Sequence, residues 1–181
     1  MTKTACVFPG QGSQSVGMLK ELAETSPIIE ATFKEASDAL GYDLWDLVQN
    51  DTDGKLNETN ITQPALLAAS VAIWRVIREQ GLDVDYLAGH SLGEYSALVC
   101  GGAMDFSDAI KLVEARGKYM QEAVPAGAGA MYAIIGLDDA EIADICQQTA
   151  IATGDVVAPV NFNSPGQVVI AGEKNAAEQA A

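Results

Sequence analysis

Residues 86–94, with the sequence YLAGHSLGE, join a short apolar run to a helix-like run. The apolar residues predict a buried strand at 86–88 and a helix at 92–99. Between them the pattern G-x-S-x-G is typical of a nucleophile elbow, in which a serine sits on a sharp strand-to-helix turn. The backbone of Ser91 would then be strained, and strand and helix would crowd the positions where only Gly89 and Gly93 fit. The stretch predicts a nucleophilic serine; the alternative is an ordinary glycine-rich turn.

Strand and helix patterns on both sides of the elbow indicate an α/β fold. Residues 4–8 predict a short buried strand, residues 62–80 a long buried helix, and residues 105–124 a further helix that Asp105 or Ser107 caps. Alternating helices and continuously apolar strands imply a parallel sheet covered on both faces. We therefore expect residues 1–124 to form one α/β core that contains the elbow.

The character of the chain changes at residues 125–129, which are rich in Pro, Gly and Ala. The elements predicted beyond this linker are a strand at 130–135, a helix at 139–149, a strand at 156–162, a turn at 163–166, a strand at 167–171 and a helix from 173. This βαββα order is one strand short of a split βαβ sandwich. We expect residues 125–181 to be a small subdomain, truncated before its last strand.

The chain is strongly acidic, with 25 acidic and 10 basic residues among 181 and a net charge of −15. Binding to nucleic acid or to an anionic membrane needs clustered Lys and Arg, so we expect neither as a partner. Cys6, Cys100 and Cys146 form no metal or redox motif, which favours unpaired thiols in a reducing compartment. No signal peptide and no apolar stretch of about 18 residues is present, so we expect a cytoplasmic protein.

Two backbone amides are candidates for stabilising an oxyanion beside Ser91. The amide of Leu92 lies at the expected start of the elbow helix and points where negative charge would develop. Gln11 follows the strand at 4–8, in a loop that Gly10 and Gly12 keep open, and its amide can lie beside the elbow. The alternatives for this loop are a plain turn or a weak dinucleotide-binding fingerprint, which lacks its third glycine.

Arg116 has an unusual position for a charged residue. Spacings of three and four residues place it on the apolar stripe of its helix, with Ala109, Val113, Met120 and Val124. A buried arginine needs an anion, and its planar fork suits a carboxylate better than lysine does. The alternative is an arginine whose head reaches solvent from the edge of the stripe.

Three motifs together resemble the malonyl-CoA:acyl carrier protein transacylase family: GHSLGE at 89–94, FPGQGSQ at 8–14 and NFNSPGQ at 161–167. The resemblance runs through the whole chain. It implies an α/β-hydrolase-like core with parallel sheet, plus an inserted ferredoxin-like subdomain that is incomplete here. It also implies that Ser91 is the nucleophile, that Gln11 and Leu92 hold the oxyanion, and that Arg116 binds the malonyl carboxylate.

The resemblance makes further residues candidates for the substrate pocket: Gln63, Met120, His90, Asn161 and Asn163. From their positions alone, Gln63 is equally well a helix-start residue, and the two asparagines are equally well turn residues. His90 is the only histidine, but it is a poor candidate for the base, because consecutive side chains at a strand end point to opposite faces. We expect the base to be a histidine beyond Ala181.

The expected function is transfer of a malonyl group from malonyl-CoA to the phosphopantetheine thiol of acyl carrier protein, through an acyl-serine, in fatty acid biosynthesis. We expect a stand-alone, monomeric enzyme of bacterial type with no metal or redox cofactor, since coenzyme A enters as part of the substrate. One alternative is an esterase-type serine hydrolase, which would leave Arg116 without a role. Another is a non-catalytic acyl-CoA-binding fragment that lacks its base.

Overall fold

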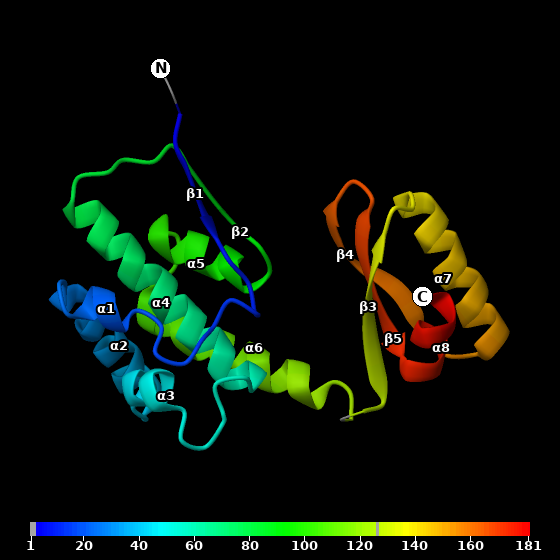
Figure 1. Ribbon diagram of the computed structural model, residues 1–181, viewed down its shortest axis with the longest axis horizontal. Helices are drawn as coiled ribbons and strands as arrows, with labels where there is room; N and C mark the ends of the chain where they lie inside the picture. The colour runs from blue at the N-terminus through cyan, green and yellow to red at the C-terminus, as the bar shows by residue number, and fades with distance from the viewer. Residues whose placement is uncertain (1–2, 126) are drawn as a thin grey trace. The chain divides into compact units, whose positions relative to one another are not determined.

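The computed structural model describes residues 3–125 and 127–181, and the chain forms two compact units, Met1–Gln121 and Glu122–Ala181 (Figure 1). The domain boundary predicted after residue 124 lies a few residues beyond the boundary at Gln121. The elements of the first unit are β1 (Ala5–Phe8), α1 (Lys20–Ala23), α2 (Pro27–Leu40), α3 (Leu44–Asn50), α4 (Thr59–Glu79), β2 (Tyr86–Gly89), α5 (Leu92–Cys100) and α6 (Phe106–Glu122). Those of the second unit are β3 (Gly129–Ile135), α7 (Asp139–Thr153), β4 (Val157–Ser164), β5 (Gln167–Glu173) and α8 (Lys174–Ala180). The fold is mixed α/β.

Strands β1 and β2 form the predicted parallel pair, in a register that runs from Ala5 opposite Tyr86 to Phe8 opposite Gly89. The carboxyl ends of β1 and β2 therefore lie side by side, next to the elbow. The prediction that helices cover both faces was wrong for the residues described. One face packs against helices, with Phe8 buried against Trp74 of α4, whereas Val7 on the other face is 74% exposed. Strand residues alternate between faces, so helices on one side leave the other apolar face open.

Helix α4 is the centre of the first unit, and residues 61–72 are all buried. It begins at Thr59, because the carbonyl of Glu58 accepts the amide of Thr62 at 2.7 Å. The helix therefore starts before the predicted residue 62, and Pro64 lies inside it. Buried side chains from α2, α3, α5 and α6 complete this core: Ile29, Phe33, Leu44, Val48, Leu92, Ile110 and Val113.

Helix α6 carries Arg116 and starts at the cap that the sequence predicted. The carboxylate of Asp105 accepts the amides of Ser107 at 2.9 Å and Asp108 at 3.2 Å. Such a cap satisfies amides that have no carbonyl partner within the helix. The cap fixes where the helix begins and hence which residues face the core.

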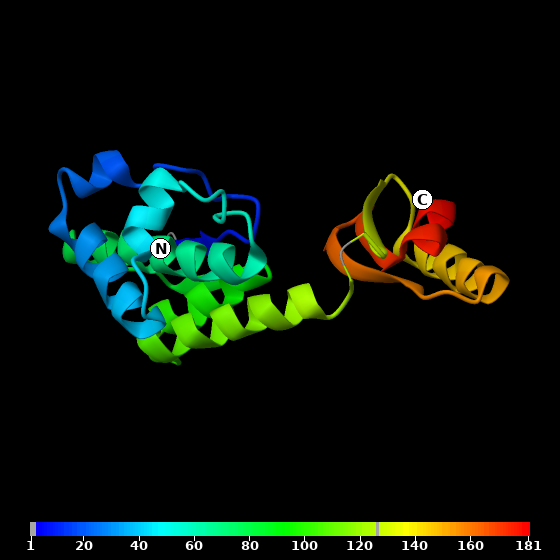
Figure 2. The same cartoon turned by 90° about the horizontal axis from the view of Figure 1, so that it is seen from below.

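The second unit is an antiparallel sheet in the order β3-β5-β4, with α7 and α8 on one face (Figures 1 and 2). Its core consists of Ile142, Cys146, Val157, Val168, Ile170, Ala176 and Ala177. The predicted turn at 163–166 is shorter in the structure. Asn163 and Ser164 extend β4, and only Pro165 and Gly166 form the loop, where Gly166 adopts a φ of 75°. The alternative that Asn161 and Asn163 are turn residues therefore does not describe them, since both belong to β4.

No helix within residues 3–125 and 127–181 is long and apolar enough to cross a membrane.

Candidate active site

The backbone of the elbow is strained at the serine. Ser91 lies between β2 and α5 with φ 52° and ψ −107°, a conformation that costs a non-glycine residue about 1–3 kcal/mol. The flanking glycines are required by close backbone approach. A Cβ on Gly89 would lie 1.9 Å from the carbonyl carbon of Gly93, and a Cβ on Gly93 would lie 2.1 Å from the oxygen of Phe8. The crowding expected from the G-x-S-x-G pattern is present.

The start of α5 offers a backbone donor next to Ser91. The amides of Gly93 and Glu94 donate to the carbonyls of His90 and Ser91, at 2.9 and 3.2 Å. Leu92 is the first residue of the helix, where an amide has no carbonyl one turn earlier to bond. Leu92 as a whole residue is only 1% exposed and its side chain belongs to the core. Its backbone N–H, at the helix start, is the group of Leu92 that could donate to an oxyanion.

The loop after β1 lies alongside the elbow, as the parallel register requires. The amide of His90 donates to the carbonyl of Phe8 at 3.1 Å, and a Cβ on Gly10 would lie 3.0 Å from the oxygen of His90. Gln11 follows directly, and its exposed side chain donates to the hydroxyl of Thr59 at 3.4 Å. The structure thus brings the segment that contains Gln11 next to the segment that contains Ser91.

Arg116 reaches the nucleophile. Its Nη2 donates to Ser91 Oγ at 3.1 Å, and its Nη1 donates to Gln63 Oε1 at 2.7 Å. Across residues 3–125 and 127–181, the ion pairs do not include Arg116. Arg116 is half-buried: its bond to Gln63 is partly buried, whereas its bond to Ser91 is exposed. The predicted apolar stripe is buried at Ala109 and Val113 but exposed at Met120 and Val124, so the arginine head lies at the edge of the stripe and bonds protein groups there. A cation beside Ser91 without a carboxylate partner is a ready site for a bound anion.

Gln63 lies on α4 and is fully buried. Its Oε1 accepts from Arg116, while its Nε2 donates to the sulfur of Met120 at 3.3 Å. The close approach of α6 to α4 makes these bonds possible. A Cβ on Gly117 would lie 2.5 Å from the Cα of Asn60, so only glycine fits at that crossing. Gln63 is the fifth residue of α4. It therefore lies beyond the first turn, and not at the helix start where the alternative interpretation placed it.

The remaining predicted residues fall in two places. A Cβ on Gly10 would lie 3.1 Å from His90 Nδ1, so the His90 ring lies against the loop after β1. Asn161 and Asn163 belong to β4 of the second unit, where Asn161 is paired with Val169. The structure therefore groups Ser91 with residues of the first unit, and describes the two asparagines only within the second.

Tyr95 is a site residue that the sequence analysis missed. The Arg116 guanidinium carbon lies 5.6 Å from the centre of the Tyr95 ring, which is within cation–π range. Tyr95 lies on the elbow helix α5, four residues after Ser91, which directly precedes the helix. Residues four apart share a helix face, and that spacing was the available signal.

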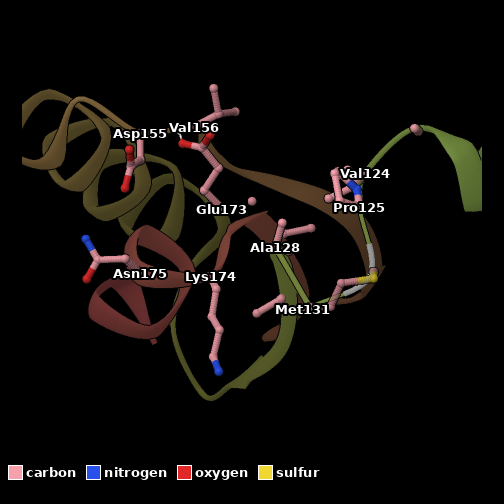
Figure 3. A pocket seen from close by; sticks show the side chains of 15 residues that line it. Val124, Pro125, Ala128, Met131, Asp155, Val156, Glu173, Lys174 and Asn175 are labelled. Carbon is pink, nitrogen blue, oxygen red and sulfur yellow. Dashed lines mark hydrogen bonds between the residues drawn. The ribbon is translucent and has the colours of Figure 1, made fainter.

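A broad cavity of about 1090 Å³ lies elsewhere, in the second unit (Figure 3). Val124, Pro125 and Met131 line it together with the ends of β5 and α8, and its charged side chains are Asp155, Glu173 and Lys174. Its described lining residues include no serine, cysteine or histidine. Neither this cavity nor any other part of the described chain gathers three His, Cys, Asp or Glu residues that could hold a metal ion. The elbow therefore remains the candidate active site.

Comparison with known proteins supports the resemblance that the three motifs predicted. The malonyl CoA-acyl carrier protein transacylase of Salmonella typhimurium is 66% identical over 181 residues, 99% of this chain and 58% of that protein. An acyl carrier protein S-malonyltransferase from Vibrio cholerae has a TM-score of 0.93 at 66% identity, over 99% of this chain and 58% of that one. A malonyl-transacylase in complex with its type II PKS acyl-carrier protein has a TM-score of 0.93 at 64% identity, with the same coverage.

This chain thus spans less than two thirds of the length of these relatives. A family model covers nearly all of the chain itself: the acyl transferase domain matches residues 5–180. The chain belongs to the acyl transferase domain family.

Proposed function

We propose that this protein transfers a malonyl group from malonyl-CoA to the phosphopantetheine thiol of acyl carrier protein, through an acyl-serine at Ser91. The observation that carries the proposal is the 3.1 Å bond from Arg116 to Ser91 Oγ. It places a cation that forms no ion pair within the described residues beside the nucleophile, where the free carboxylate of a malonyl group would lie. The names of the similar proteins, which are malonyltransferases, support the same choice.

The reaction proceeds in two matched halves. Ser91 Oγ attacks the thioester carbonyl, the amides of Leu92 and Gln11 hold the oxyanion, and coenzyme A leaves as a thiol that carries the serine proton. The phosphopantetheine thiol then attacks the acyl-serine and restores the Ser91 hydroxyl. Arg116 binds the carboxylate in both halves. Attack and expulsion need only a nucleophile, a base and oxyanion donors, so the proposed reaction requires no metal or redox cofactor.

We propose that the base is a histidine outside these 181 residues. Two observations support this. The chain has a single histidine, His90, and its ring lies against Gly10. The relatives are also considerably longer than this chain.

The rival functions fit the site less well. An esterase-type hydrolase uses the same elbow, but it has no need for a cation bonded to its nucleophile. A non-catalytic acyl-CoA-binding fragment has no need for the strained backbone of Ser91, because binding alone does not require an exposed nucleophile. Transfer of an acyl group that carries a carboxylate accounts for both features.

For the domains, we propose that residues 1–124 form an α/β-hydrolase-like core and residues 125–181 a ferredoxin-like subdomain. The division into two compact units supports this, as does the strand order β3-β5-β4. A ferredoxin-like sheet has its first and second strands on either side of the third, as found here, and a fourth strand beside the first.

The substitution Arg116→Ala tests the proposed function in a protein extended to the length of its relatives. We expect kcat/KM for malonyl-CoA to fall about 100-fold, because two charge-assisted hydrogen bonds to the carboxylate are lost. The value for acetyl-CoA should change far less. Arg78→Ala is the control, since Arg78 is exposed and bonds Leu82 and Asp83. Equal losses with both acyl groups would contradict the role of Arg116.

A further inference from the structure

The guanidinium of Arg116 is held from three sides without any ligand. Its two terminal nitrogens donate to Gln63 and Ser91, and its guanidinium carbon lies over the Tyr95 ring, 5.6 Å from the ring centre. These three partners come from α4, from the elbow and from α5. A long side chain that would otherwise sample many rotamers therefore has three contacts that restrict it in the absence of substrate.

The contacts of Gln63 distinguish it from a residue that binds substrate. The side chain is fully buried, its Oε1 accepts from Arg116 at 2.7 Å, and its Nε2 donates to Met120 at 3.3 Å. Both ends of the amide are thus occupied by the protein itself. The amide has a second N–H and a second lone pair, but Gln63 is 0% exposed, so a substrate could reach neither without disturbing the packing around it. Gln63 is suited to orient Arg116.

Tyr95 complements Gln63 by contacting a different part of the arginine. An aromatic face attracts the flat surface of a guanidinium, so the ring can hold Arg116 without occupying its N–H groups. The N–H edge remains available to oxygen atoms, as the bond to Ser91 Oγ demonstrates. Gln63 bonds one terminal nitrogen and Tyr95 contacts the guanidinium carbon, while Nη2 donates to the nucleophile.

We propose that Gln63 and Tyr95 are positioning residues that hold the guanidinium of Arg116 beside Ser91 before any acyl group binds. A held guanidinium accepts a carboxylate without first losing side-chain freedom. The consequence for malonyl selection rests on the proposed function, whereas the restraint of Arg116 does not depend on it.

The restraint is measured from the NMR signals of arginine N–H groups in the complete protein, without substrate. We expect separate, slowly exchanging Nη signals for Arg116 in the wild type and averaged signals in Gln63→Leu and Tyr95→Leu. Tyr95→Phe keeps the ring and should keep the wild-type signals. Arg75 is an internal reference for the fold, because Thr32, Glu35 and the Phe106 ring hold it independently. Averaged Arg116 signals in the wild type, or unchanged signals in both leucine variants, would overturn the proposal.

Steady-state kinetics with malonyl-CoA and acetyl-CoA then tests the consequence. We expect KM for malonyl-CoA to rise about tenfold in Gln63→Leu and about threefold in Tyr95→Leu. The value of kcat should change little, because a contact with the malonyl carboxylate is equally strong in the ground state and the transition state. Tyr95→Phe should restore the wild-type KM. Equal changes for both thioesters would mean a merely structural role and would overturn the proposal. A wild-type protein that does not prefer malonyl-CoA would refute the proposed function instead, and the NMR signals would still decide the role of Gln63 and Tyr95.

Discussion

Adding one methyl group at the crossing of α4 and α6 should disturb both the fold and the site. In Gly117→Ala the new Cβ would lie 2.5 Å from Asn60 Cα and 2.7 Å from both Asn60 N and Thr59 O. These are backbone atoms, which cannot move away by changing a rotamer. The two helices must separate by roughly 1 Å to restore ordinary van der Waals contact.

The magnitude follows from two opposing effects. Overpacking of this kind costs about 1–3 kcal/mol, and a clash with backbone atoms belongs at the upper end. Alanine in place of glycine inside a helix returns about 1 kcal/mol. We therefore expect the free energy of unfolding of the first unit to fall by about 2 kcal/mol. The same separation would stretch the 2.7 Å bond from Arg116 to Gln63 beyond hydrogen-bonding range.

Urea unfolding followed by tryptophan fluorescence measures this change in the relevant unit alone. Both tryptophans of the chain, Trp45 and Trp74, lie in the first unit. A loss of about 2 kcal/mol should lower the urea midpoint by about 1 M. Lys111→Ala, at an exposed position of the same helix, should change stability by less than about 0.5 kcal/mol. If Gly117→Ala were as stable as the wild type, the close helix approach would not limit residue 117, and the reasoning would be wrong.

Three further experiments, two with substitutions and one with the 181-residue chain itself, have expected outcomes. Asp105→Ala removes the cap of α6 and should lower the free energy of unfolding by about 1 kcal/mol in the same fluorescence assay; an unchanged midpoint would show that the cap is dispensable. Burial raises the pKa of Cys100 to about 12, so the stability it contributes is full below the unfolded thiol pKa of about 8.5 and is lost as pH rises toward 12. Cys100→Ala should therefore reduce the fall in urea midpoint between pH 8 and 10, and an equal fall in both proteins would contradict that origin. The 181-residue chain mixed with malonyl-CoA should show negligible acylation of Ser91 by intact mass, because the proposed base lies outside it; rapid acylation would mean that His90 or another group present acts as the base.

The features that local spacing determines were predictable from the sequence. The elbow follows from Gly89 and Gly93, because a serine at a sharp strand-to-helix turn leaves no room for a Cβ at either position. The cap at Asp105 and the stop of α2 at Gly41, which has φ 82°, also depend on neighbouring residues only. Such signals lie within a few residues of the structure they specify.

The features that the sequence did not reveal depend on distant residues. The bond between Gln63 and Arg116 joins positions 53 residues apart, and no local pattern specifies how closely α6 approaches α4. The exposed face of β1, with Val7 at 74%, was also missed. An apolar strand has the same sequence whether a helix covers one face or both, so the extent of cover depends on what packs against the sheet.

The bond between Arg116 and Ser91 also bears on how the site would discriminate between acyl groups. In the free protein Arg116 Nη2 occupies a lone pair of Ser91 Oγ. A carboxylate is a stronger acceptor than a hydroxyl, because its hydrogen bonds to a guanidinium join two charges. Under the proposed function, a malonyl carboxylate therefore replaces Ser91 Oγ as the acceptor of Nη2 while Gln63 and Tyr95 keep the guanidinium in place, and the serine oxygen is left free to attack. An acetyl group has no carboxylate to do so, and the arginine continues to hold the nucleophile. The same residue would favour the correct substrate and hold back the wrong one.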